Sequence, residues 1–464
     1  MCNRWYYPSF NPYNVCNINI TLVFNKRCSG FCIYLTAVQF KHITNIPISS
    51  LSRKAVARIS ILLLLLVINS GVIAQRLDLK ILGKYKRIEL PFIVENDFMV
   101  INILLDNVIP VRFIIDTGAE NTVLLEKKMT DLLEVDYRKT FQVRGADVDN
   151  ILTAHLATGI DLRIADRLLA RNRSMLVLEE NYFDFERITG TSIQGILGAD
   201  FLMRFTVEFD FRRQIMTLHE PDDWKPTNKH VEMPSEFVRN RPYLSVPVSV
   251  TGSQVTERRL LLDSGAGLTL LMHTFGDSTD IDLPQLTVPT YIANGLGGSL
   301  EGSVGRAREI ELGGKSLQNV ISYFQPVDTA GLKFLNDRQG IIGNRLLRRF
   351  NVVINYTRKK VWLRPEGSRW KNKFKFDRSG LTVLAGGPNL RTYTIASVIP
   401  GSPAGLAGLR VRDRIVAING KSVGFMTLSG ILRKLVGKVG KKVKIRYSRD
   451  GEYTVVTFRL KDLI

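Results

Sequence analysis

Cysteine and histidine are scarce in this sequence, and each scarcity excludes a kind of site. The chain of 464 residues has four cysteines, all near its start: Cys2, Cys16, Cys28 and Cys32. The residues after them can therefore form neither a disulfide nor a thiolate metal site. Only five histidines are present, and four of them show no metal-ligand spacing (His155, His219, His230 and His273). We expect no metal and no other cofactor.

Acidic residues are absent from the first 74 positions, which contain seven lysines and arginines. The whole chain has a formal net charge of +21, and the part after residue 74 is still basic. Such a balance suits nucleic-acid or anionic-membrane partners. Because the charges are dispersed rather than clustered with aromatic residues, we expect a solvated basic surface and no nucleic-acid partner. Binding to an anionic membrane surface is the alternative.

One long apolar run, residues 59–68, stands near the start of the chain behind basic residues at 53–58 and before small residues that end at Ala74. This order is typical of a secretory signal peptide. It predicts a signal over residues 53–74, cut between Ala74 and Gln75, and a periplasmic or secreted protein. The run is short for a membrane span, so we expect no integral span after cleavage, with a retained anchor as the alternative.

Residues 1–52 precede this signal and show no clean hydrophobic period. Since signal peptides begin near the start of a chain, we interpret them as a start-site extension, disordered or absent from the native protein. No methionine lies between Met1 and Met99, so the start would use another codon near Leu51 or Val56.

The rest of the sequence contains an internal repeat. Residues 111–124 (VRFIIDTGAENTVL) recur as residues 258–271 (RRLLLDSGAGLTLL), at an offset of 147. Residues 196–205 (ILGADFLMRF) recur as residues 341–350 (IIGNRLLRRF), at an offset of 145. Two signatures in the same order at nearly the same spacing predict a tandem duplication.

Both copies have the pattern of mainly β domains. A short helix should follow each second signature, and then an alternating strand at 206–211 and at 351–356. Residues 221–234 contain prolines and many polar residues, which predicts a linker between two lobes. We therefore place lobe 1 at residues 75–225 and lobe 2 at residues 226–366.

Each copy carries an Asp-Thr/Ser-Gly triplet between two hydrophobic runs. Glycine lets two such loops approach without Cβ clashes, and the hydroxyls can satisfy backbone groups of the opposite loop. Two carboxylates held close together cannot both ionise, so they share a proton. One can then activate a water while the other donates its proton. The candidate catalytic residues are Asp116 and Asp263, supported by Thr117, Gly118, Ser264, Gly265, Gly198 and Gly343.

The run around Asp116 resembles the active-site segment of retropepsin-like aspartic proteases, and two unequal copies in one chain resemble the pepsin-like enzymes. The Gly198 and Gly343 elements resemble the hydrophobic-hydrophobic-Gly element that buttresses that loop. The resemblance covers residues 90–366 and implies a bilobal aspartic-protease β-barrel fold that hydrolyses peptide bonds. We expect an exported, monomeric aspartic endopeptidase that acts on polypeptides. The alternative is a catalytically inactive peptide-binding or scaffold protein of the same fold.

Pepsin-like enzymes usually have Ser or Thr directly after the motif glycine, where it donates to the catalytic carboxylate. Here both positions are alanine, Ala119 and Ala266. Loss of a donor to the charged form raises a carboxyl pKa. We therefore expect a pH optimum in mildly acidic to near-neutral conditions.

Between the paired signatures, each lobe should carry a hairpin that closes over substrate. The candidate flaps are residues 141–150, with Gly145, and residues 294–305, with Gly295, Gly297 and Gly298. A plain flexible hairpin is the alternative.

Residues 398–420 (VIPGSPAGLAGLRVRDRIVAING) closely resemble a PDZ domain, which implies a C-terminal α+β PDZ domain over residues 367–464. Its carboxylate-binding loop would be Gly380, Leu381, Thr382 and Val383, whose N–H groups receive a peptide C-terminus. The peptide would add as a strand beside the helix expected at 427–436. A PDZ domain that only packs on the protease is the alternative.

Overall fold

The computed structural model describes residues 79–81, 85–144, 151–165, 167–252, 254–274, 281–295, 298–327, 335 and 337–464. The predicted start-site extension and signal peptide lie outside these residues and stay predictions. No helix in these ranges has the length and apolarity that a membrane span requires.

Six strands of lobe 1 close into a barrel, because β9 pairs with both β6 and β8. In spatial order they are β9 (Leu168–Leu178), β6 (Val123–Leu124), β10 (Gly195–Leu197), β5 (Ile109–Ile115), β4 (Phe98–Leu105) and β8 (Ile151–Ile164). Three further strands extend this sheet: β1 (Leu79–Ile81), β3 (Ile93–Glu95) and β7 (Tyr137–Arg144). The short helices of lobe 1 are α2 (Lys128–Asp131), α3 (Phe185–Thr189) and α4 (Ala199–Leu202).

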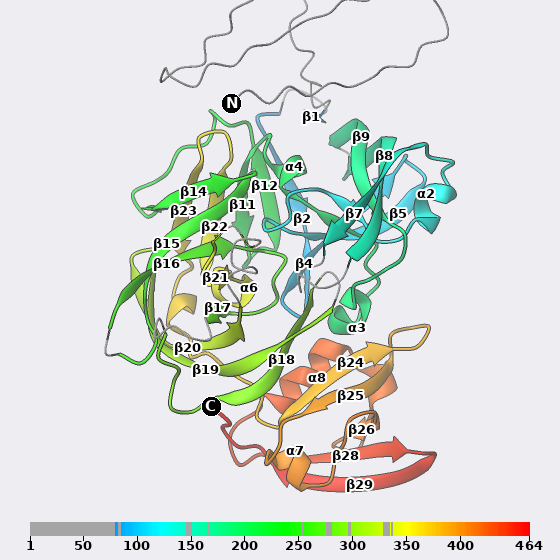
Figure 1. The fold of residues 1–464 in the computed structure, drawn as a ribbon, viewed down its shortest axis with the longest axis vertical. Helices are drawn as coiled ribbons and strands as arrows, with labels where there is room; N and C mark the ends of the chain where they lie inside the picture. Colours follow the sequence, from blue (N-terminus) through cyan, green and yellow to red (C-terminus); the bar gives the residue numbers. More distant parts are fainter. Residues whose placement is uncertain are drawn as a thin grey trace, which may run out of the picture. The chain divides into compact units, whose positions relative to one another are not determined.

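Lobe 2 repeats this barrel, closed by a pairing between β15 and β19. Its ring contains β15 (Arg241–Ser249), β16 (Thr256–Leu262), β21 (Gly340–Ile342), β17 (Leu270–Thr274), β20 (Lys315–Pro326) and β19 (Gly298–Leu312). Strands β14 (Ser235–Val238) and β18 (Val288–Gly295) extend it, and α6 (Asn344–Leu347) follows β21. In both lobes, the strand that ends at the motif Asp runs parallel to the strand of the second signature. The predicted duplication and bilobal β-barrel fold are confirmed (Figure 1).

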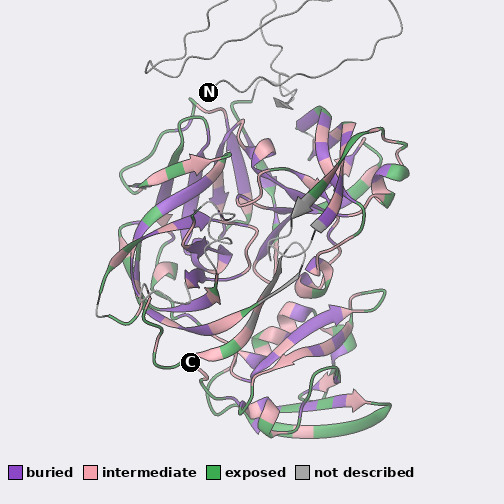
Figure 2. Cartoon of the chain, in the orientation of Figure 1, coloured by how far each residue is buried: buried purple, intermediate pink, exposed green. Residues whose placement is uncertain are grey.

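A third sheet joins the lobes. Its order is β13 (Val231–Met233), β23 (Lys360–Pro365), β22 (Phe350–Asn355), β11 (Thr206–Asp210), β12 (Ile215–His219) and β2 (Arg87–Pro91). The central pair, β11 and β22, is antiparallel and contains one strand from each repeat. Strand β13 lies inside the predicted linker, so part of that linker is a sheet edge. One hydrophobic core is continuous through both barrels and this sheet. Figure 2 shows that many of these strands are buried.

The C-terminal residues form a separate core in an α+β domain, as predicted. Its strands are β24 (Leu381–Gly386), β25 (Thr392–Val398), β26 (Arg414–Ile418), β27 (Lys421–Ser422), β28 (Lys442–Arg449) and β29 (Glu452–Arg459). Its helices are α7 (Pro403–Leu406), η3 (Val423–Phe425) and α8 (Leu428–Leu435). The side chains of Ser402 and Thr427 cap α7 and α8, each accepting a backbone N–H three residues on. Strand β24 is an edge of the sheet.

The connector before this domain packs on lobe 2. It includes η2 (Arg369–Lys371), and Phe374 belongs to the protease core rather than to the PDZ core. The guanidinium of Arg349 lies over the Phe374 ring, 3.6 Å from its centroid. These contacts attach the connector to α6 and its surroundings.

Candidate active site

The two motif carboxylates occupy equivalent positions at the ends of two barrel strands. Asp116 follows β5, and its N–H donates to the carbonyl of Leu197 at 3.0 Å. Asp263 follows β16, and its N–H donates to the carbonyl of Ile342 at 3.0 Å. Both line one cavity of about 710 Å³ between the lobes. The fold thus brings together two residues that are 147 positions apart.

Thr117 and Ser264 cross-link the two loops beneath the carboxylates. Each backbone N–H donates to the side-chain oxygen of the other residue, at 3.0 Å in both directions. Each hydroxyl donates in turn to a carbonyl of the opposite lobe, Thr117 to Leu262 at 2.7 Å and Ser264 to Ile115 at 2.8 Å. All these groups are buried, so the four bonds leave none of them unsatisfied and set the relative position of the loops.

The motif glycines leave room for the opposite carboxylate. A Cβ at Gly118 would lie 2.6 Å from the Cγ of Asp263, closer than real Cβ contacts allow. The equivalent position in the other loop, Gly265, faces Asp116 in the same way. Close approach, rather than backbone strain, therefore requires glycine at both positions.

The second-signature glycines lie behind these loops. Gly198 donates its N–H to Thr122 Oγ1 at 3.2 Å, and a Cβ there would come within 2.5 Å of the Asn121 carbonyl oxygen. Gly343 donates to the Thr269 carbonyl at 3.0 Å. The next residue, Asn344, donates from Nδ2 to the Ser264 carbonyl at 2.5 Å. Gly198 and Gly343 thus bond to the segments that follow the two Asp loops, and the sequence had predicted a supporting role for both.

The two carboxylates are partly buried and interact with each other, and they differ in their surroundings. Burial raises the pKa of Asp116 well above its usual value, and the neighbouring Asp263 raises it further. The N–H groups of Gly118 and Ala119 oppose this rise by donating to Asp116 Oδ1 at 2.7 and 2.9 Å. Burial also raises the pKa of Asp263, but the Arg338 guanidinium opposes it. The pair thus favours a shared proton held on Asp116.

Arg338 is a residue of this site that the sequence reasoning missed. It lines the same cavity, and its Nε lies 3.4 Å from Nε2 of His273. Arg338 lies three residues before Ile341, and its counterpart in the first repeat, three residues before Ile196, is the buried Ile193. A charged residue at the position of a buried apolar one is the signal that could have identified it. Within the described ranges, no group of three His, Cys, Asp or Glu side chains is placed to hold a metal ion.

Both expected flaps fall on β-hairpins. In lobe 1, β7 and β8 pair up to Arg144 and Ile151, and Gly145 lies outside the described residues. In lobe 2, β18 and β19 pair up to Gly295 and Gly298, and Gly297 lies outside them. Thr290 and Ile292 of β18 line the cavity of the carboxylates, so this hairpin borders the site.

The expected carboxylate-binding loop of the PDZ domain is held by a carboxylate of its own. Asp377 Oδ2 accepts the N–H groups of Ser379 at 3.0 Å, of Gly380, and of Leu381 at 3.3 Å. Gly380 needs its positive φ of 83° for this turn, which glycine adopts without strain. Burial raises the pKa of Asp377 to about 6. Two donors expected for a peptide C-terminus are therefore already engaged.

The PDZ groove opens into the cavity of the two carboxylates. Gly380, Leu381, Thr382 and Val383 line that cavity, together with Leu432 and Val436 at the end of α8. Helix α3 of lobe 1 lies against β24 (Figure 1). The β24 edge and the candidate catalytic dyad, Asp116 and Asp263, therefore border one continuous space.

Comparison with known proteins agrees with this architecture. Residues 101–201 and 246–346 each match the aspartyl protease family, and residues 394–449 match the PDZ domain. The chain is similar to two proteins of Bacillus subtilis (strain 168), the carboxy-terminal processing proteases CtpA, 46% identical over 57 residues, and CtpB, 37% identical over 67 residues. These matches cover 12% and 14% of this chain and the same shares of the relatives' own lengths. The prediction from the repeated motifs is confirmed at this level: the chain contains two tandem segments of the aspartyl protease family and a C-terminal PDZ domain.

Proposed function

We propose that this protein is an aspartic endopeptidase in which Asp116 and Asp263 together activate a water molecule. The observation that carries the proposal is the pair itself: two half-buried, interacting carboxylates that line one cavity, on loops cross-linked by Thr117 and Ser264. A buried like-charged pair is costly unless it shares a proton, which is the state that this chemistry needs.

The asymmetry of the pair assigns the proton transfers. Asp263, ionised beside Arg338, accepts a proton from the water as its oxygen attacks the scissile carbonyl carbon. Asp116 donates its proton to the carbonyl oxygen, which gives a neutral tetrahedral diol. When the diol collapses, the C–N bond breaks, the amine leaves with the proton held by Asp263, and Asp116 recovers its proton from the diol hydroxyl.

The PDZ domain would bind a substrate or partner segment beside β24 and hold it next to the dyad. The shared cavity supports this role, since a bound segment would enter the space that Asp116 and Asp263 line. Tethering of this kind raises the local concentration of substrate without new contacts at the dyad. The names of CtpA and CtpB, which refer to carboxy-terminal processing, agree with a role for chain ends.

The protein would act after export, as the basic and apolar pattern of residues 53–74 indicates. N-terminal sequencing of the native mature protein tests this, with Gln75 as the expected first residue. Peptides from residues 1–52 in the native precursor would contradict the interpretation of that segment.

The activity is tested by incubating the mature chain, Asp116→Asn and Asp263→Asn with an unfolded protein between pH 3 and 8. We expect cleavage by the wild type and loss of every cut in both variants, with unchanged circular dichroism. If the wild type cleaves nothing across this range, the inactive peptide-binding alternative is favoured.

A further inference from the structure

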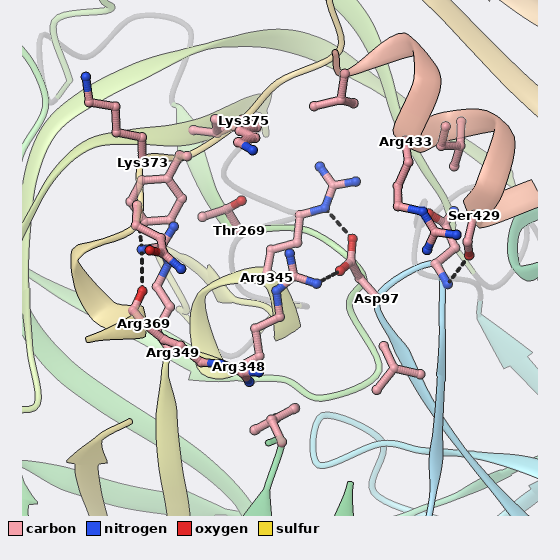
Figure 3. A pocket seen from close by; sticks show the side chains of 18 of the residues that line it. Asp97, Thr269, Arg345, Arg348, Arg349, Arg369, Lys373, Lys375, Ser429 and Arg433 are labelled. Atoms are coloured by element: carbon pink, nitrogen blue, oxygen red, sulfur yellow. Dashed lines mark hydrogen bonds and ion pairs between the residues drawn. The ribbon is translucent and has the colours of Figure 1, made fainter. Parts of the chain in front are cut away.

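A second cavity, of about 860 Å³, lies where lobe 1, lobe 2 and the PDZ domain meet. Its lining comes from the β3–β4 turn, from α6 and the residues after it, from the connector, and from α8 (Figure 3). The proposed proteolysis gives no role to the charged side chains of this cavity, although Leu432 and Val436 also border the cavity of the two carboxylates.

Positive charge dominates the lining. Among the described residues that border it, eight are basic and one, Asp97, is acidic. Asp97 already accepts two guanidinium groups: Nε of Arg345 at 2.5 Å and Nη1 of Arg348. Glu95 of β3, outside the lining itself, interacts electrostatically with Arg433. The cavity thus keeps a large excess of positive charge.

Part of this charge is built into the core. Arg349 is 8% exposed, and its Nη1 donates to the carbonyls of Trp370 at 3.0 Å and Asn372 at 2.5 Å. Its Nε is buried without a partner among the described residues. Burial, together with the neighbouring Arg348, lowers the pKa of Arg349 to about 10.

Thr269 provides a second unpartnered group in the same lining. It is fully buried, and its Oγ1 has no hydrogen-bond partner in the described part of the chain. A buried hydroxyl and a buried guanidinium N–H without partners are rare in folded proteins, and both are hydrogen-bond donors.

The remaining cations come from elements that only this fold brings together. Lys373 and Lys375 lie on the exposed connector, and Arg433 projects from α8. Figure 3 shows Arg433 and Ser429 on one side of the cavity, Lys373 and Arg349 on the other, and the Asp97 pairs between them. An anion in this space would contact lobe 2, the connector and the PDZ domain at once.

We propose that this cavity binds a compact anion with two or more phosphoryl groups, and that the bound anion ties α8 of the PDZ domain to α6 of lobe 2. Several arginines favour phosphoryl groups because the guanidinium fork binds them through paired, charge-assisted hydrogen bonds. A single carboxylate or chloride brings too little charge to balance the cluster. The phosphoryl groups could belong to a free oligophosphate or to a phosphorylated lipid headgroup.

The proposal is tested by titrating the mature chain with inorganic tripolyphosphate in a calorimeter at physiological salt. We expect saturable binding at one site per chain and a higher midpoint of thermal unfolding in its presence. Lys373→Gln and the double variant R348Q/R433Q should weaken binding by about tenfold or more, since each removes charge-assisted bonds. Arg171→Gln, an equal charge change at an exposed residue of β9 outside the cavity, should bind as the wild type does.

Because Lys373 is exposed, K373Q keeps the proposal testable if the double variant does not fold. The second arm measures binding to phosphatidylcholine vesicles with and without a phosphoinositide bisphosphate. Binding to free tripolyphosphate supports a site for a soluble oligophosphate. Binding only to the vesicles that contain the phosphoinositide supports a site for a lipid headgroup. Absence of binding in both arms, equal binding by K373Q, R171Q and the wild type, or equal affinity for a triglutamate peptide would overturn it.

Discussion

Gly265 lies so close to Asp116 that a Cβ built on this glycine would stand 2.2 Å from the Asp116 Cγ. Gly265→Ala should therefore displace a candidate catalytic carboxylate and abolish cleavage, while the barrel strands stay folded. Gly424→Ala is the matched control, because a Cβ there meets nothing nearer than 3.7 Å. Peptidase assays with circular dichroism check both variants, and an active G265A enzyme would contradict the packing of the two loops.

The cross-link beneath the dyad should contribute both stability and activity. Ser264→Ala removes the acceptor of the Thr117 N–H and leaves that donor buried and unpaired. A buried unsatisfied donor costs about 1–3 kcal/mol, so the free energy of unfolding should fall by that amount. We expect kcat/KM to fall as well, since the carboxylates lose their alignment. Denaturant unfolding of S264A is compared with Ser245→Ala, which changes an exposed serine; equal losses in both would contradict this role.

Arg338 should set the acid side of the pH profile. The guanidinium opposes the burial that raises the pKa of Asp263, so Arg338→Gln leaves Asp263 protonated to higher pH. The acid limb of kcat/KM should move up by about one pH unit in R338Q, since a nearby opposite charge shifts a carboxyl by about 1–3 units. Arg338→Lys keeps the positive charge and should keep most of the wild-type profile. Identical profiles in R338Q and the wild type would show that Arg338 does not act on Asp263.

The dyad should make the protein less stable as the pH rises. Both carboxyl groups have raised pKa values in the folded state, so the folded chain binds more protons than the unfolded chain above pH about 4. The stabilisation is complete below the unfolded pKa and is lost as the pH rises through the folded values. Asp116→Asn removes one of the coupled charges and should unfold at a higher temperature than the wild type at pH 7.5. The difference should shrink toward pH 4; calorimetry at both pH values checks it, and a constant difference would contradict the coupling.

The PDZ groove should accept peptide C-termini better in mild acid. Asp377 has a pKa of about 6 and, when ionised, engages the loop N–H groups and repels a second carboxylate. The affinity for a peptide with a free apolar C-terminus should rise as the pH falls below about 6, and Asp377→Asn should bind it more tightly at pH 7.5. Fluorescence anisotropy of a labelled peptide measures this, with the same peptide amidated as control. Affinity that is independent of pH in the wild type would show that Asp377 does not compete.

The bilobal fold and the positions of the two carboxylates could be predicted from the sequence alone. Two copies of Asp-Thr/Ser-Gly and two of Ile/Leu-Gly repeat at nearly constant offsets. Such contiguous motifs can be recognised in the sequence without a structure. The PDZ domain was predicted for the same reason, because its Pro-Gly-Ser-Pro-Ala turn and Asn-Gly turn are contiguous.

Features that depend on distant segments were decided only by the tertiary structure. Arg338 faces Asp263 because two barrel strands run side by side, and the cationic cavity unites Asp97, Arg348 and Arg433 from three parts of the chain. The motif pattern shows which side chains carry chemistry, since that depends on residue type and near neighbours. Which charges share a dielectric environment depends on packing between elements far apart in sequence, and only the folded chain decides that.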